Sequence, residues 1–202
     1  APYVVSMDSS TTSVEVLKRD DLDTAPAAVL GDVLSGLPGV RSTFFGPGAS
    51  RPVIRGLAGP RVLVLTNGVG MIDASALSPD HQVATDPQEA ERIEVLRGPS
   101  ALAYGGSAIG GIVNIIADRI PHQLVDGVHG RMLVSGSSGD DGKMASAAFK
   151  AGVGNWVLSL DGLRRTSEDY TVPVAQMSRR LAAEEGLPEP SLSETKVANS
   201  AV

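Results

Sequence analysis

Residues 91–116 of the chain, ERIEVLRGPSALAYGGSAIGGIVNII, form its most specific stretch of sequence. Residues 91–96 have the pattern of a strand, which is followed by Arg97, and residues 111–116 form a second, almost entirely apolar strand. Between the two strands, Pro99 can open a short helix that Gly105 and Gly106 close. The stretch therefore predicts two strands connected by a short helix and tight turns.

Short strands and helices are also predicted before this stretch. Val14 and Val16 alternate as in a strand, and apolar residues recur at helical spacing between Val29 and Leu37. Asp86 can cap a helix that begins at the next residue, a proline. The predicted elements are a strand from Ser13, a helix that begins after Thr24 with Pro26 in its first turn and ends at 37–39, strands at 53–55 and 61–65, a turn at Asn67-Gly68 and a helix start at 86–89.

The composition changes near residue 125, after which the sequence is typical of antiparallel strands separated by Gly and Asp turns. In residues 145–153 every odd position is apolar, and in the next segment Trp156, Leu158 and Leu160 share one face. Each strand has about 10 residues, the length of an outer-membrane strand. One face suits lipid and the other water, although a soluble antiparallel sheet has the same alternation, and alternation alone favours that alternative.

The predicted connections fit the same arrangement of strands. Residues 137–143 are expected to form an outer hairpin and residues 152–155 a short inner turn, which places Trp156 at a membrane interface. Residues 167–193 are expected to form a longer outer loop, within which 174–185 can be helical.

A second signature lies upstream, where residues 52–57 read PVIRGL. Together with residues 91–116 it resembles the plug domain of TonB-dependent outer-membrane receptors. The resemblance implies an α+β plug domain, a small mixed sheet with short helices, followed by antiparallel strands of an incomplete transmembrane β-barrel. The expected organisation is a flexible N-terminal arm over 1–12, the plug domain over 13–122 and the first barrel strands over 123–202.

The resemblance also implies a location and a mechanism. In this family the plug faces the periplasm within an outer-membrane barrel of about 22 strands, which 202 residues are too few to form, so we expect the front portion of a receptor. A scarce ligand docks on the outer face, and the TonB complex of the inner membrane grips an N-terminal strand by strand addition and pulls. Tyr3, Val4 and Val5 are candidates for that contact. The expected partners are the TonB complex, the ligand and outer-membrane lipid.

Two arginines match the plug arginines that, in this family, pair with glutamates of the barrel wall. Arg55 belongs to the PVIRGL signature, and Arg97 follows the strand at 91–96. A guanidinium binds a carboxylate through two hydrogen bonds, and the carboxylates are expected to lie outside this chain. The alternative is an ordinary arginine whose aliphatic stem covers the end of a strand. The remaining glycine and proline positions of the two signatures are expected to have a structural role in the turns; they are Gly56, Gly98, Pro99, Gly105, Gly106, Gly110 and Gly111.

The transported ligand is predicted from residues 73–87, where Asp80 and His81 stand together. A carboxylate and an imidazole suit zinc or a similar ion, but two ligands make only half of a tetrahedral site. The segment resembles the apical loop of receptors linked to zinc uptake, where such a pair contributes metal ligands. The remaining ligands would come from barrel loops. A solvated polar turn is the alternative, and His122 and His129 are interpreted as solvated or interfacial.

Composition and motifs exclude several other classes of function. The net charge is −6, with 17 Lys and Arg against 23 Asp and Glu and no basic block, which argues against nucleic-acid binding. The chain has no Cys, so it has no disulfides or thiolate ligands. No phosphate-loop lysine, nucleophile elbow or His-Glu-x-x-His motif is present, so we do not expect an enzyme.

The sequence is therefore interpreted as part of an outer-membrane receptor that imports a scarce ligand, with zinc or another metal as the first choice. Haem or chelated iron is the alternative cargo, and no cofactor is required. A soluble plug-like module that binds a protein partner and never enters the membrane is the alternative function.

Overall fold

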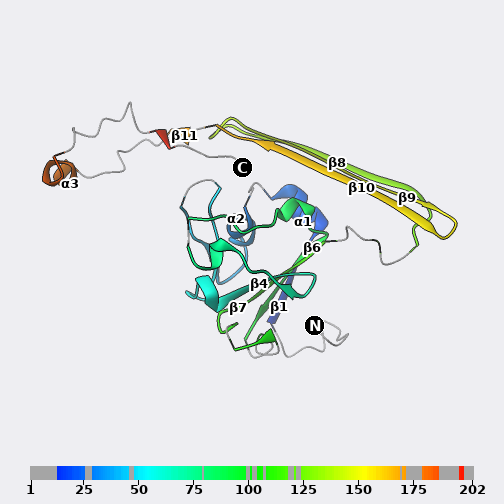
Figure 1. The fold of residues 1–202 in the computed structure, drawn as a ribbon, viewed down its shortest axis with the longest axis horizontal. Coiled ribbons are helices and arrows are strands. Elements are labelled where there is room, and N and C mark those ends of the chain that lie inside the picture. Colours follow the sequence, from blue (N-terminus) through cyan, green and yellow to red (C-terminus); the bar gives the residue numbers. More distant parts are fainter. Residues whose placement is uncertain are drawn as a thin grey trace. The chain divides into compact units, whose positions relative to one another are not determined.

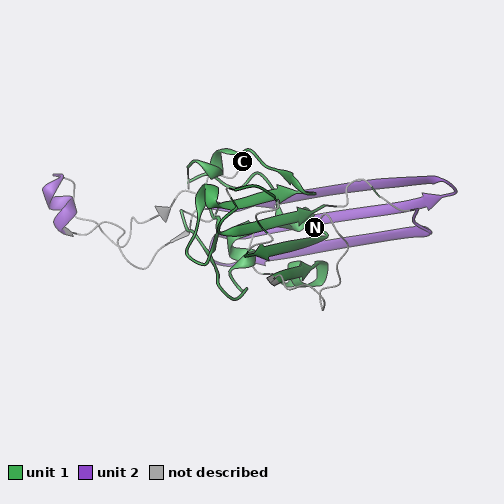
Figure 2. Cartoon of the chain, turned by 90° about the horizontal axis from the view of Figure 1, so that it is seen from below, with its two compact units in different colours: residues 1–122 green, residues 123–202 purple. Residues whose placement is uncertain are grey.

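The computed structural model describes residues 13–25, 29–45, 48–78, 80–98, 101, 104–106, 108–117, 121, 124–168, 170–171, 179–186 and 196–197. The chain divides into two compact units, residues 1–122 and 123–202, which Figure 2 shows in different colours. Among the described residues, no helix is both long and apolar enough to cross a membrane.

The first unit is built on a mixed sheet of five strands in the order β1-β6-β7-β4-β5, which confirms the predicted plug architecture (Figure 1). β7 pairs antiparallel with β6 and parallel with β4, and β1 and β5 form the two edges. A separate two-stranded sheet pairs β2 with β3. The strands are β1 (Ser13–Lys18), β2 (Val40–Ser42), β3 (Pro52–Ile54), β4 (Val62–Thr66), β5 (Val69–Gly70), β6 (Arg92–Arg97) and β7 (Gly111–Ile116).

Both faces of this sheet are covered by apolar side chains. Successive side chains of a strand point to opposite faces, and Val95 and Val113 belong to one buried cluster whereas Leu96 and Ile112 belong to another. Burial on both faces explains why the central strand β7 has a nearly continuous apolar sequence. The first cluster includes residues of two short helices, α1 (Arg19–Thr24) with Leu22 and α2 (Leu30–Leu34) with Leu30, Val33 and Leu34.

The helices differ from their predicted extents. The helix predicted between Thr24 and Leu37 is only α2 in its described part, because the chain turns at Ser35, whose backbone N–H bonds to Asp32 O. Residues 26–28 of that prediction lie outside the described residues. The helix start predicted at 86–89 is a single 3₁₀ turn, η4 (Pro87–Glu89), although Asp86 caps it as expected by accepting from Gln88 N. α1 has no counterpart in the predictions. Asp21 supports its first turn by accepting a hydrogen bond from Lys18 N at 2.8 Å.

The turns of the first unit shift two strand boundaries by one residue. β3 ends at Ile54, so Arg55 lies beyond the strand, and β4 begins at Val62 after the 3₁₀ turn η2 (Gly59–Arg61). The turn predicted at Asn67-Gly68 is confirmed, since it connects β4 to β5. Both of its residues have positive φ, 50° and 80°, as the tight hairpin turns that match strand twist require.

The second unit contains three long antiparallel strands that pair in sequence order. They are separated by residues 138–141 and by Gly154-Asn155, which confirms the hairpin and the short turn predicted there. The strands are β8 (Gly127–Ser137), β9 (Gly142–Val153) and β10 (Trp156–Thr166). The predicted helix within 174–185 appears as α3 (Arg179–Glu184), and β11 (Tyr170–Thr171) pairs with β12 (Lys196–Val197).

One face of β8–β10 carries exposed apolar side chains. Leu160 pairs with Phe149, which in turn pairs with Gly130, so the apolar positions of neighbouring strands fall on the same face. Gly130 leaves room for that aromatic ring, because a Cβ there would lie 2.6 Å from Phe149 Cδ1. The exposed apolar residues of this face are Val128, Met132, Val134, Phe149, Val153, Trp156, Leu158 and Leu160.

Candidate functional site

The predicted metal pair lies in the segment between β5 and η4. Asp80 Oδ1 lies 3.0 Å from His81 Nδ1 and also accepts a hydrogen bond from the Ser78 hydroxyl. These hydrogen bonds from Ser78 and His81 lower the pKa of the Asp80 carboxyl, so it is ionised at neutral pH. Both side chains are accessible to a ligand, with 62% of Asp80 and 54% of His81 exposed.

The pair offers a partial coordination set. Its carboxylate oxygen and imidazole nitrogen are ligand types that zinc accepts. Among the described residues no third His, Cys, Asp or Glu joins them. The donor set therefore suits an ion that completes its coordination with water or with groups outside the described residues.

Asp73 forms hydrogen bonds with residues on both sides of the Asp80–His81 pair. One carboxylate oxygen of Asp73, Oδ1, accepts from the Ser75 hydroxyl at 2.5 Å and from Ala76 N at 3.2 Å. The other oxygen, Oδ2, accepts from Ala84 N at 3.1 Å. Burial raises the pKa of Asp73, but the hydrogen bonds of Ser75, Ala84 and Ala76 and the charge of Arg51 outweigh it, so the pKa lies below its usual value.

Arg51 connects this segment to the rest of the first unit. Its side chain is buried, and its Nη1 donates to Ser75 Oγ at 3.1 Å. Its backbone is fixed by an exchange with Thr43, since Arg51 N donates to Thr43 Oγ1 and Thr43 N donates to Arg51 O, both at 2.9 Å. Burial lowers the pKa of Arg51 and the Asp73 charge partly restores it. The guanidinium nevertheless stays charged at neutral pH.

Arg97 is one of the two arginines predicted to pair with the barrel wall. It is almost completely buried, with 6% of its side chain exposed. It forms an ion pair with Glu15 of β1, and its Nη1 donates to Pro38 O. Arg97 therefore has one carboxylate partner within this chain, which the sequence reasoning did not foresee. The pairing of β1 with β6 is the reason, because it brings Glu15 opposite Val95, two residues from Arg97.

Arg55, the other arginine predicted to pair with the barrel wall, lies in a turn directly after β3. It has a φ of 50° and an exposed side chain. It has no ion pair within the described part of the chain. Its backbone N–H donates to Gly39 O at 2.9 Å, next to the Pro38 carbonyl that Arg97 binds. The structure thus brings both arginines to the Pro38-Gly39 turn.

Five of the six predicted structural glycines occupy positions that favour glycine, through a positive φ or a close neighbouring atom. Gly56, Gly98, Gly105 and Gly111 have positive φ. Gly111 is the most restricted of these, because a Cβ there would lie 2.8 Å from Leu96 O. At Gly110 a Cβ would lie 2.9 Å from Leu57 Cβ, whereas Gly106 has open space around it.

The other predicted residues are either outside the described part of the chain or exposed. Pro99 lies outside the described residues, as do Tyr3, Val4, Val5 and His122. His129 is exposed, with Nε2 2.9 Å from Asp126 O.

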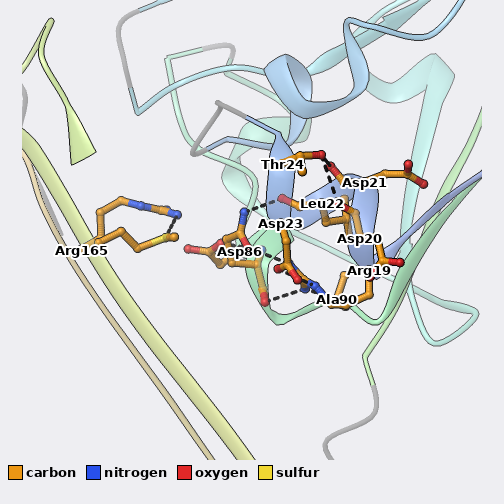
Figure 3. A network of polar contacts seen from close by, with 11 residues as sticks. Arg19, Asp20, Asp21, Leu22, Asp23, Thr24, Asp86, Ala90 and Arg165 are labelled. Atoms are coloured by element: carbon orange, nitrogen blue, oxygen red, sulfur yellow. Dashed lines mark hydrogen bonds and ion pairs between the residues drawn. The ribbon is translucent and has the colours of Figure 1, made fainter. Parts of the chain in front are cut away.

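A further polar network, which sequence reasoning missed, is centred on Arg19 and is shown in Figure 3. Arg19 binds Asp23 at 2.6 Å, Gln88 O at 2.9 Å and Gln88 Oε1 at 2.7 Å, and it also donates to Ala90 O. Gln88 Nε2 donates to Leu22 O at 3.1 Å. The network attaches α1 to the segment that leads into β6. Within this network, the Arg19–Asp23 ion pair is the contact that could have been predicted from the sequence, because the two residues have i,i+4 spacing.

Comparison with known proteins gives consistent matches over most of the chain. The family model "TonB-dependent Receptor Plug Domain" matches residues 6–112. The chain is 32% identical over 150 residues to "Vitamin B12 transporter BtuB" of Photobacterium profundum, covering 74% of this chain and 25% of the relative. It is 29% identical over 175 residues to "Iron-regulated outer membrane virulence protein" of Vibrio cholerae serotype O1, covering 83% of this chain and 26% of the relative.

Among solved structures, "Copper transporter OprC" superposes with a TM-score of 0.67 over 80% of this chain and 25% of that one. At 23% identity, this similarity concerns the fold alone. The chain spans about a quarter of the length of the curated relatives it matches.

Proposed function

Because this chain belongs to the TonB-dependent receptor plug family, we propose that it forms the plug and first barrel strands of a receptor that imports zinc or another transition metal. The family assignment confirms the resemblance carried by residues 52–57 and 91–116, and it assigns the chain to the outer membrane. The relatives are named for different cargoes, vitamin B12 and copper among them. The cargo of this chain must therefore be argued from its own residues.

The observation that supports a metal is the Asp80–His81 pair. The pair combines an ionised carboxylate with an imidazole, and both side chains are exposed. A ligand taken up from dilute solution needs such an accessible site, and zinc binds both ligand types. The metal is cargo rather than a resident cofactor, and the missing ligands are proposed to come from barrel loops.

Two features support the receptor over the soluble interaction module. The first is the family match, and the second is the apolar face of β8–β10, which leaves large side chains such as Trp156 and Leu158 exposed. A soluble sheet normally covers one apolar face, whereas an outer-membrane strand presents it to lipid. One curated relative is named as a transporter, which is consistent with a protein that is not an enzyme.

Arg97 supports the further proposal that the plug is locked to the barrel wall. Its Nε and Nη2 atoms are buried and have no hydrogen bond within the described part of the chain, although Nη2 takes part in the ion pair with Glu15. Because Nη1 binds Pro38 O and Nη2 pairs with Glu15, Nε is the donor that we propose for a second acceptor, a carboxylate or carbonyl of the barrel wall. Transport would then depend on the TonB complex, which we propose grips the N-terminal arm that includes Tyr3, Val4 and Val5.

The metal proposal is tested by titrating the 202-residue chain in detergent with Zn²⁺ alone and following its labelled histidines by NMR. We expect the imidazole signal of His81 to shift, and the shift to be lost in His81→Ala and weakened in Asp80→Asn. His129→Ala is the matched control, because it removes another exposed histidine outside the pair. Titration with hemin tests the alternative cargo. A His81 signal that ignores zinc would rule out the metal site in this chain.

A further inference from the structure

We propose that Asp73, Ser75 and Arg51 form a positioning clamp that holds the 73–84 loop in the shape that presents Asp80 and His81 to a metal. This inference rests on the proposed function, because it assigns a role to residues that support the same site. None of the three would be a metal ligand. They would act through the backbone and the side chains that they hold.

The clamp closes the loop at its two ends. Asp73 Oδ2 accepts from Ala84 N, eleven residues further along, while Oδ1 accepts from Ser75 Oγ and Ala76 N. A single carboxylate thus binds both ends of the segment that contains Asp80 and His81. Hydrogen bonds to an ionised carboxylate are shorter and stronger than those between neutral groups.

Apolar packing holds this loop only at its far end, where Val83 is 2% exposed and belongs to the main buried cluster. Between residues 72 and 82, Ser75 is the one buried residue among those that the structure describes, and Ile72 and Leu77 are highly exposed. A loop without apolar burial opens easily, since little free energy opposes its conformational entropy. The carboxylate of Asp73 therefore fixes the part of the loop before Val83, which apolar burial does not hold.

Arg51 fixes the clamp to the body of the first unit. Its guanidinium is buried, bonds to Ser75 Oγ and provides the positive charge that acts on Asp73. Because Arg51 is attached to Thr43 through its backbone, the guanidinium has a defined position next to β2 and β3. The loop is consequently anchored at Ser75, between its free tip and the sheet.

A preformed loop raises the apparent affinity for metal. If only a fraction of the molecules holds the pair in the binding geometry, the apparent dissociation constant rises by the inverse of that fraction. Loss of a hydrogen bond to a charged group lowers the ratio of closed to open loop by about tenfold or more, and the closed fraction falls in proportion once the open loop predominates. The clamp thus affects zinc affinity without contacting zinc.

The test compares Asp73→Asn and Ser75→Ala with the unaltered 202-residue chain in detergent. Asp73→Asn replaces the acceptor Oδ2 by an NH₂ group that cannot accept from Ala84 N, and Ser75→Ala removes the connection to Arg51. The matched control is Asp86→Asn, which alters another capping aspartate, one that accepts from Gln88 N outside the loop. Three readings are taken for each protein: zinc affinity from the His81 NMR signal, hydrogen exchange of the Ala84 amide, and the midpoint of thermal unfolding.

We expect both clamp variants to weaken zinc binding by up to about tenfold and to speed exchange at Ala84 more than at amides outside the loop. The thermal midpoint should fall as well, because the buried Arg51 loses a partner in each variant, and Asp86→Asn should leave zinc affinity unchanged. Faster exchange at Ala84 with unchanged zinc affinity would overturn the clamp and leave the proposed function standing. Absence of zinc binding in the unaltered chain would overturn the proposed function, and the clamp with it. If Asp73→Asn fails to fold, Ser75→Ala decides by the same readings.

Discussion

A buried guanidinium requires a carboxylate near it, and Glu15 provides one for Arg97. Glu15 is 31% exposed, whereas Arg97 is 6% exposed, so burial removes more of the hydrating water from the arginine than from the glutamate. Removal of one partner from such a pair leaves the other charge buried and uncompensated. The ion pair thus connects the edge strand β1 to the end of β6 at the position of a family signature.

Glu15→Gln should therefore destabilise the chain. We expect a loss of about 1 to 3 kcal/mol, below the value for a fully buried pair because Glu15 is partly exposed to solvent. The measurement is urea unfolding of the 202-residue chain, with Glu91→Gln as the control because Glu91 is exposed and adjoins the same strand. Equal stabilities of the two variants would show that Arg97 does not depend on Glu15.

At the scale of elements, the first unit is stabilised by polar contacts between short segments as well as by its core. α1 has only six residues and is too short to be stable by itself. Leu22 packs into the main cluster, and Arg19 binds Gln88 and Ala90, which precede β6. The helix is therefore held against the sheet by one apolar and one polar attachment.

Arg19→Ala should detach α1 from the segment at 88–90. We expect a loss of about 2 kcal/mol, because one guanidinium serves two backbone carbonyls, an amide oxygen and a carboxylate. Arg180→Ala is the matched control in urea unfolding, since Arg180 also has an acid at i+4, Glu184, but is 87% exposed. An exposed pair of this kind contributes about 0.5 kcal/mol or less. Similar losses for the two variants would contradict the attachment.

At the scale of the whole molecule, the two units differ in how the apolar faces of their sheets are covered. The first unit buries apolar residues on both faces of its sheet, whereas β8–β10 leave one apolar face exposed. Strands with such a face are stable in water only when something covers it. Lipid or detergent is the cover that the family assignment indicates for this face.

Leu158→Asp should weaken association of the chain with detergent micelles. We expect a cost of about 1 kcal/mol, because the substitution places a charge on the face that contacts apolar chains, close to the interface, where an acidic residue costs less than at the midplane. Ser159→Asp is the control, since it introduces the same charge on the opposite face of β10. The fluorescence of Trp156, the only tryptophan, reports the association through a shift to shorter wavelength. An equal effect of both variants would contradict the assignment of the faces.

The sequence by itself determined the elements whose patterns are local. Alternation over residues 145–160 predicted β9, β10 and the turn between them, because a strand's faces follow directly from a period of two. The glycine and proline positions of residues 52–57 and 91–116 carried the family resemblance, because tight turns depend on few residue types. The adjacent pair Asp80 and His81 was visible for the same reason, since neighbours in sequence are neighbours in space.

The tertiary structure alone decided which distant groups meet. Arg97 and Glu15 are 82 positions apart, and Arg19 and Gln88 are 69 apart, so only the pairing of β1 with β6 and the packing of α1 could reveal them. The same holds for Arg51 and Ser75, which are 24 positions apart. Periodicity records which side of an element is buried, but hydrogen bonds between elements depend on register and packing. That is why the fold could be predicted from the sequence while the contacts that support the candidate site could not.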